Sequence, residues 1–208
     1  MTSDAVRDQM LDLVDRLAGL DDEQWDAQSL CSQWRVRDVL AHITAGETGA
    51  FRVSRVAAGL LRHGFDYDRW LAVDGQTQGQ QEPATILRSF RTAAANRKPA
   101  RGGREIRALT HVFVHGQDIC RLLSIRRDLP ESQLVAIASY VATSIIFRAN
   151  RYVAGLTLTA SDVEWTHGDG PEVSGSAEAL VMLMAGRRIV IDELTGEGLP
   201  RLQRTVGK

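Results

Sequence analysis

Two histidines, His111 and His115, stand four residues apart in a stretch from Arg104 to Ser124 whose apolar pattern predicts one helix. Residues four apart on an α-helix share a face, so both imidazole rings can reach one ion. Neutral imidazoles suit zinc, nickel, iron or copper. The residues between them lack the glutamate of the His-Glu-x-x-His metalloprotease motif. The spacing therefore indicates a metal chelate without peptidase chemistry, and two ordinary histidines remain the alternative.

A third ligand has to come from elsewhere in the chain, and His42 is the best candidate. It lies in the segment WRVRDVLAHITAGE on a predicted inner helix face, where an unpartnered polar ring costs free energy. Helical bundles build metal sites from inward side chains, and catalytic zinc often has three protein ligands. Asp38 and Asp118 lie close to His42 and His115 in sequence. Either carboxylate can fix a ring tautomer, or else it faces solvent.

The other potential ligands receive no metal role from their sequence context. His63 and His167 stand in predicted loop or strand-end settings, and we expect them at the surface. Cys31 and Cys120 lie outside any Cys-x-x-Cys spacing, which predicts two buried, reduced thiols. Basic residues dominate between Ile86 and Arg107 without interleaved aromatic residues. That run predicts a solvated face and no nucleic-acid stacking surface.

Hydrophobic periodicity predicts five helices before residue 153. The run from His63 to Glu82 has lost this periodicity, so we predict a loop with a short aromatic turn there. The predicted helices are a first from a Thr2 or Ser3 cap to about Leu20, a long second from about Trp34 to Leu60, a third starting at Pro83, the histidine helix Arg104 to Ser124, and a fifth from Pro130 to Tyr152.

After residue 153 the period changes to two. Alternating residues at 156–160, 163–165 and 172–175 predict three short antiparallel strands. Ser176 is the expected cap of a following helix, and a last helix is predicted from Leu199 to Val206. The domains expected are therefore a helical bundle over 1–152 and a small α+β domain over 153–208.

The composition is that of an ordinary soluble protein. The 208 residues are 44% hydrophobic and 25% charged with a net charge of -1, which argues against a disordered or nucleic-acid-coating chain. The N-terminus has no basic region followed by an apolar run, and no stretch approaches the length of a membrane span. We therefore expect a cytoplasmic protein.

Three segments together carry a family resemblance: WRVRDVLAHITAGE, HVFVHGQDICRLL and VEWTHGDGPEVSGSAEALVMLMAGR. They resemble the mycothiol-dependent maleylpyruvate isomerase family over nearly the whole chain. The resemblance implies a DinB-like α-helical four-helix bundle followed by a small α+β C-terminal domain. It also implies a divalent metal, zinc first and nickel as the alternative, held by His42, His111 and His115. The family has a glutamate where this chain has His111, so this site carries one negative charge fewer.

The resemblance implies a thiol-cofactor mechanism as well. Mycothiol would ionise with its sulfur at the metal and attack a small electrophile, in an isomerisation or an S-transfer. Arg187 matches an arginine implicated in catalysis, with Arg188 as the competing assignment and a surface cation as the alternative. The partners expected are a small-molecule electrophile and a low-molecular-weight thiol, with no nucleic acid and no membrane, and a monomer or homodimer. A non-catalytic metal- or ligand-binding protein or sensor is the alternative function.

Overall fold

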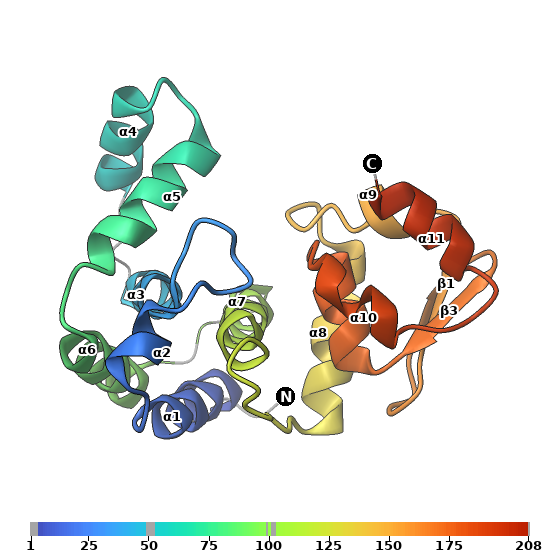
Figure 1. Cartoon of the computed structure of the whole chain (residues 1–208), viewed down its shortest axis with the longest axis horizontal. Helices are drawn as coiled ribbons and strands as arrows, with labels where there is room; N and C mark the ends of the chain where they lie inside the picture. The colour runs from blue at the N-terminus through green and yellow to red at the C-terminus, as the bar shows by residue number, and fades with distance from the viewer. Residues whose placement is uncertain (1–3, 49–52, 99, 101–102, 208) are drawn as a thin grey trace. The chain divides into compact units, whose positions relative to one another are not determined.

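The protein is described by a computed structural model covering residues 4–48, 53–98, 100 and 103–207. The chain divides into two compact units, Thr2–Arg127 and Asp128–Lys208. Figure 1 colours the first unit from blue to green and the second from yellow to red. No helix within the described residues is long and apolar enough to cross a membrane.

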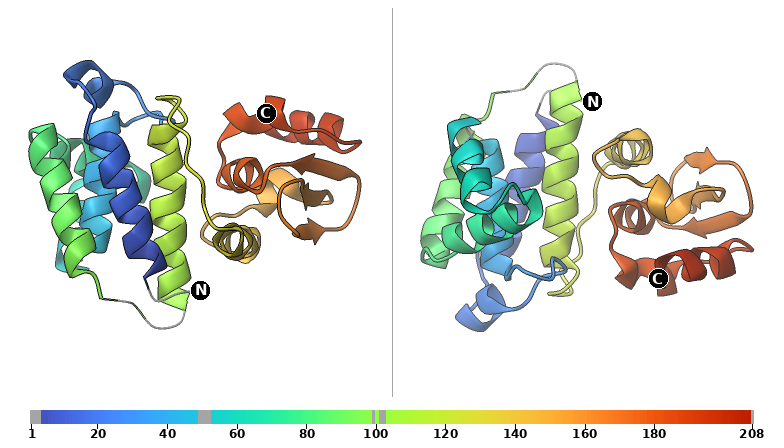
Figure 2. Two further views of the ribbon diagram at one scale, coloured as in Figure 1. Left: turned by 90° about the horizontal axis from the view of Figure 1, so that it is seen from below. Right: turned by 90° about the horizontal axis from the view of Figure 1, so that it is seen from above.

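Four helices form the core of the N-terminal unit: α1 (Ala5–Leu17), α3 (Val36–Glu47), α6 (Pro83–Asn96) and α7 (Gly103–Cys120). Helices α1 and α3 each pack against both α6 and α7, which makes a four-helix bundle (Figure 2). Each fully buried Leu, Ile, Met or Phe side chain contributes about 1.5–3 kcal/mol relative to an exposed one. The largest of these side chains are Met10, Leu13, Leu17, Leu40, Ile43, Ile86, Phe90, Leu109, Phe113 and Ile119. The predicted bundle is confirmed.

A buried ion-pair network also fixes α3 and α7 relative to α6. Arg97, just after α6, is 2.9 Å from Glu47 at the end of α3 and 3.0 Å from Glu105 in α7. The guanidinium donates two parallel hydrogen bonds to Glu105. The prediction of a solvated basic face is therefore wrong for Arg97, because its side chain is buried beside both carboxylates.

The described part of this unit also contains the helices α2 (Asp22–Asp26), α4 (Val53–Arg62) and α5 (Tyr67–Gln78). The loop predicted from 63 to 82 is wrong, since α5 occupies most of it. Asp66 caps α5 by accepting a hydrogen bond from the Arg69 amide, and only Trp70, Ala72 and Gly75 are buried along it. A helix with so few apolar positions has little visible periodicity. The long second helix was predicted across residues 49–52, which lie outside the described residues, as do Thr2 and Ser3.

The C-terminal unit is built around α10 (Ala177–Met184), which packs on α8 (Glu131–Thr143) and on α9 (Asn150–Val153). The Ser176 side chain caps α10, as predicted, by accepting a hydrogen bond from the Ala179 amide. The fifth helix predicted from 130 to 152 is wrong in its middle, because α8 ends at Thr143 and a turn separates it from α9. The boundary predicted after residue 152 also differs from the division after Arg127. The reason is that α8 buries its apolar face against α10.

A 3₁₀ helix, η1 (Arg188–Glu193), and the helix α11 (Leu199–Val206) end this unit, with α11 as predicted. Its sheet contains β1 (Thr157–Ala160), β2 (Thr166–Gly168) and β3 (Glu172–Gly175) in the order β2-β1-β3. β2 runs antiparallel to β1, but β3 runs parallel to it. The prediction of three antiparallel strands is therefore wrong, and the second strand lies at 166–168 rather than 163–165.

The parallel pairing depends on two glycines, Gly168 at the end of β2 and Gly170 in the connection to β3. Gly168 has φ +94° and Gly170 has φ +143°, and a Cβ at either position would lie 2.2 Å from a backbone oxygen. Only glycine tolerates both conditions. Residues 169–171 can therefore pass from one side of β1 to the other beside its first residue, Thr157. β3 then begins opposite Thr157 and runs in the same direction as β1.

Candidate metal centre

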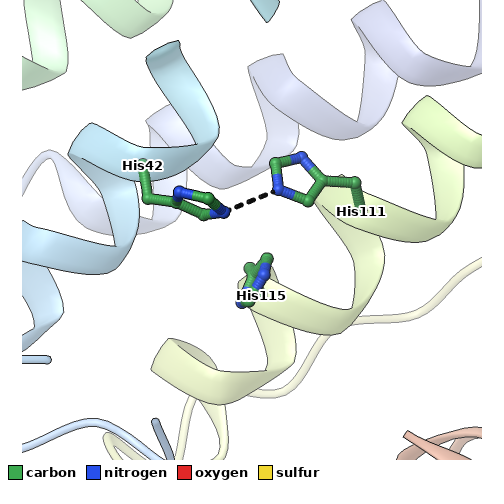
Figure 3. A group of neighbouring side chains, drawn as sticks. All are labelled: His42, His111 and His115. Carbon is green, nitrogen blue, oxygen red and sulfur yellow. Dashed lines mark hydrogen bonds between the residues drawn. The ribbon is translucent and has the colours of Figure 1, made fainter. Parts of the chain in front are cut away.

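The structure brings together all three predicted histidines, His42 from α3 and His111 and His115 from α7 (Figure 3). The centroid of the His42 ring lies 5.0 Å from that of His111 and 5.1 Å from that of His115. The centroids of the two rings on α7 are 4.9 Å apart. His42 Nε2 and His111 Nε2 are 3.0 Å apart. One ligand atom from each ring lies within 4.8 Å of the others. The rings form a nearly equilateral group in the bundle.

Burial keeps two of these rings neutral. Burial, followed by the neighbouring His115 and His111, lowers the pKa of His42 far below its usual range. Burial, followed by His115 and Arg107, lowers the pKa of His111 to about 3. A neutral imidazole has one nitrogen lone pair available to a metal ion, and an imidazolium has none. The donor set therefore fits a divalent cation such as zinc, for which three histidines and an open position are a common arrangement.

Asp118 orients His115, as its spacing predicted. The Asp118 carboxylate is completely buried in α7, and Oδ2 lies 3.0 Å from His115 Nδ1. Because the carboxylate accepts a hydrogen bond, it favours the tautomer with the proton on Nδ1 and the lone pair on Nε2. His115 Nε2 is therefore the nitrogen available to the histidine cluster.

Asp38 has a different role from the one predicted. Its carboxylate accepts hydrogen bonds from the Arg35 amide at 2.9 Å and from the Arg35 guanidinium at 3.0 Å and 3.1 Å. Asp38 is the third residue of α3, where a carboxylate satisfies the free amide groups of the helix start. The prediction that it orients His42 is therefore wrong, because capping of α3 holds the carboxylate at the helix N-terminus.

Trp34 covers the His42 ring, a contact that the sequence pattern does not predict. The two ring centroids are 4.6 Å apart, and the indole N–H donates to the Ala72 carbonyl of α5 at 3.0 Å. Gly75, one turn further along α5, lies against the same indole, where a Cβ would be 2.6 Å from ring atoms. Helix α5 therefore holds Trp34, and Trp34 limits the positions open to His42.

The Gly75→Ala substitution should lower both stability and metal affinity. Overpacking against the indole costs about 1–3 kcal/mol, which exceeds the gain of up to about 1 kcal/mol from replacing a helical glycine. We expect a lower urea midpoint and weaker zinc binding, since Trp34 has to shift against His42. Gly19→Ala is the control, because a Cβ there meets nothing within 4 Å. Equal midpoints for the two variants would contradict this packing argument.

Cys31 differs from its predicted state. It is half-buried, whereas Cys120 is buried as expected. The Cys31 thiol donates to Asp118 Oδ2 at 3.0 Å, and its Sγ lies 3.7 Å from His115 Nδ1. The loop between α2 and α3 brings it there, and no sequence spacing relates it to α7. The contact therefore could not be found from the sequence pattern.

The remaining candidates lie outside these groups. His63 follows α4, and His167 in β2 stacks on Trp165 with ring centroids 6.0 Å apart. Both are half-buried rather than fully at the surface, and neither joins a group of ligand residues in the part of the chain that the structure describes. Arg187 precedes η1 in the C-terminal unit and donates to the Ala185 carbonyl. Arg187 is half-buried and Arg188 is exposed, so Arg187 remains the stronger candidate, and its catalytic role stays a prediction.

Residues 6–120 match the family described as the mycothiol maleylpyruvate isomerase N-terminal domain. The chain belongs to this family. The matched residues run from α1 to the end of α7, and they include His42, His111 and His115. The resemblance seen in the sequence is thereby confirmed.

Two solved structures are similar to this family member over more of the chain than the matched domain. One is a histidine-to-alanine variant of the mycothiol-dependent maleylpyruvate isomerase, with a TM-score of 0.62 and 16% identity. The other is a structure of the mycothiol-dependent maleylpyruvate isomerase, with a TM-score of 0.58 and 14% identity. Each comparison covers 93% of this chain and 90% of the other. At such identities the likeness shows the fold, and no curated protein matches this chain significantly.

Proposed function

We propose that this protein is a divalent-metal-dependent and mycothiol-dependent enzyme, an isomerase or thiol S-transferase that acts on a small electrophile. The observation that carries the proposal is the convergence of His42, His111 and His115 inside the bundle. Membership of the family supports a thiol reaction at that position. Zinc is the cation that this donor set favours, and nickel is the alternative.

Each residue has a distinct part in this proposal. His42 and His111 offer lone pairs at neutral pH because burial lowers the pKa of both rings. Asp118 keeps the His115 proton on Nδ1, so that Nε2 faces the cation. A divalent cation bound there would act as a Lewis acid that lowers the pKa of a thiol, and more strongly beside three neutral ligands than beside a carboxylate.

The ionised thiol would attack an electrophilic carbon of the substrate. Addition to a carbon–carbon double bond permits rotation about that bond before the thiol leaves, which is isomerisation. Retention of the adduct is S-transfer instead. We propose that the Arg187 guanidinium binds a substrate carboxylate through two parallel hydrogen bonds. The partners are thus a low-molecular-weight thiol and a small electrophile, and the enzyme acts as a monomer or homodimer without nucleic acid.

The test combines zinc-loaded protein with mycothiol and a panel of small electrophiles that includes maleylpyruvate. We expect at least one compound to react faster than with mycothiol alone. His42→Ala should return that rate to the uncatalysed level, and His63→Ala should keep it, because His63 lies outside the histidine cluster.

A metal-loaded protein that accelerates none of these reactions would sink the enzymatic proposal. It would favour the second candidate, a non-catalytic metal- or ligand-binding protein or sensor with the same fold. The specific observation behind that candidate is His111, which replaces the glutamate of the family pattern at a metal-facing position.

A further inference from the structure

A second group of potential ligands adjoins the histidine cluster and shares one ring with it. Cys31, His115 and Asp118 each offer one ligand atom, and these atoms lie within 4.8 Å of one another. They comprise a thiol sulfur, an imidazole nitrogen and a carboxylate oxygen. All three atom types bind zinc in proteins.

Backbone hydrogen bonds hold Cys31 at this place. The Leu30 amide donates to the Asp118 carbonyl at 3.1 Å, which ties the loop to the end of α7. The Cys31 carbonyl accepts from the Trp34 amide at 2.8 Å and from the Gln28 side chain at 2.7 Å. The thiol is therefore positioned by the fold and not by a freely moving loop.

The distances come close to those of a tetrahedral site. Zinc bonds of about 2.3 Å to sulfur and about 2.05 Å to nitrogen, at a tetrahedral angle, place the two ligand atoms about 3.6 Å apart. Cys31 Sγ and His115 Nδ1 are 3.7 Å apart. Asp118 Oδ2 is 3.0 Å from both, because it accepts a hydrogen bond from each. A cation that replaces these two protons needs the carboxylate to move by only about half an ångström.

We propose that Cys31, His115 and Asp118 form a second metal position, which takes a thiophilic divalent cation such as zinc, cadmium or cobalt. The first position uses His115 Nε2, and the second uses His115 Nδ1. Binding at the second position releases the Cys31 thiol proton to solvent, together with the Nδ1 proton when Nε2 already holds a cation. Because the His115 ring serves both positions, the second cation binds more weakly while the first is present. No oxidation or reduction takes place.

Cobalt(II) titration of the metal-free protein tests this proposal, since a cobalt–thiolate bond gives a charge-transfer absorption band that imidazole ligands do not. We expect two cobalt ions per chain, with the thiolate band developing on the second equivalent. In His42→Ala, which lacks a ligand of the first position only, the band should develop on the first equivalent. This result does not depend on any reaction with mycothiol, so it separates the second position from the proposed function.

Cys31→Ser should abolish the band and Cys120→Ser should keep it, because Cys120 belongs to neither ligand group. Alkylation of the unmodified protein gives an independent measurement. Cadmium in twofold excess should slow iodoacetamide reaction at Cys31 at least about tenfold, since the metal-bound thiolate is no longer available. Absence of the band at saturating cobalt would overturn the proposal. In the unmodified protein, binding of only one cobalt per chain with the full thiolate band would also overturn it, because a single mixed site would then explain all binding.

Discussion

Replacing His111 with alanine is expected to lower the affinity of the protein for zinc by on the order of 100-fold or more. Loss of an outer partner of a metal ligand typically costs 10–100-fold, and loss of a ligand costs at least the upper end of that range. His111 Nε2 lies 3.0 Å from His42 Nε2, so its removal leaves two imidazoles where three converge. Competition with a chromophoric chelator in a Cys31→Ser background, which lacks the second proposed metal position, measures the zinc affinity of the histidine site.

Two further variants make the affinity measurement specific. His167→Ala removes a histidine from β2 and should leave zinc affinity unchanged, because His167 belongs to neither ligand group. His111→Glu restores the residue type of the family pattern and should keep zinc affinity within about tenfold, since carboxylate oxygen also binds zinc. Equal zinc affinities with and without His111→Ala in the Cys31→Ser background would remove the case for the histidine site.

The metal-free protein should lose about 4 kcal/mol of stability between pH 7.5 and pH 5.0 through His42 and His111. An unfolded histidine binds a proton with a pKa of 6.5, whereas burial lowers the pKa of both rings in the folded protein. The unfolded chain therefore binds more protons below pH 6.5, and stability falls as the pH falls toward the folded-state values. Each ring that stays neutral at pH 5.0 accounts for about 2 kcal/mol. Urea unfolding at the two pH values measures the loss.

Comparison of variants isolates this contribution from that of the other titrating groups. His111→Gln keeps a neutral polar side chain but cannot titrate, so its loss of stability on acidification should be about 2 kcal/mol smaller than that of the unmodified protein. Equal losses of unfolding free energy on acidification in His111→Gln and in the unmodified protein would contradict this contribution.

These expectations show how far local spacing determines a site. The spacing of His111 and His115 places both rings on one helix face, and the position of His42 on an apolar face directs it into the bundle. Both inferences depend only on the helical repeat and on burial, so they could be made from the sequence. Asp118 is likewise one turn from His115, and its contact was predictable for the same reason.

Contacts between separate segments required the tertiary structure. Asp38 stands one turn from His42, yet its carboxylate caps the start of α3 instead of orienting the His42 ring. Sequence spacing alone does not tell which of these two interactions forms. The position of Trp34 depends on α5, whose few apolar residues hid its helical nature. The boundary after Arg127 and the parallel strand β3 depend on which element packs beside α10 or β1.

The sequence by itself therefore determined the bundle, the three histidines and the order of helices followed by a small sheet, because these depend on repeats of two and of 3.6 residues. The tertiary structure alone decided that Cys31 reaches Asp118 and that Trp34 covers His42. A loop has no repeat that fixes the direction of its side chains. Its hydrogen bonds to the end of α7 and the packing of α5 fix them instead.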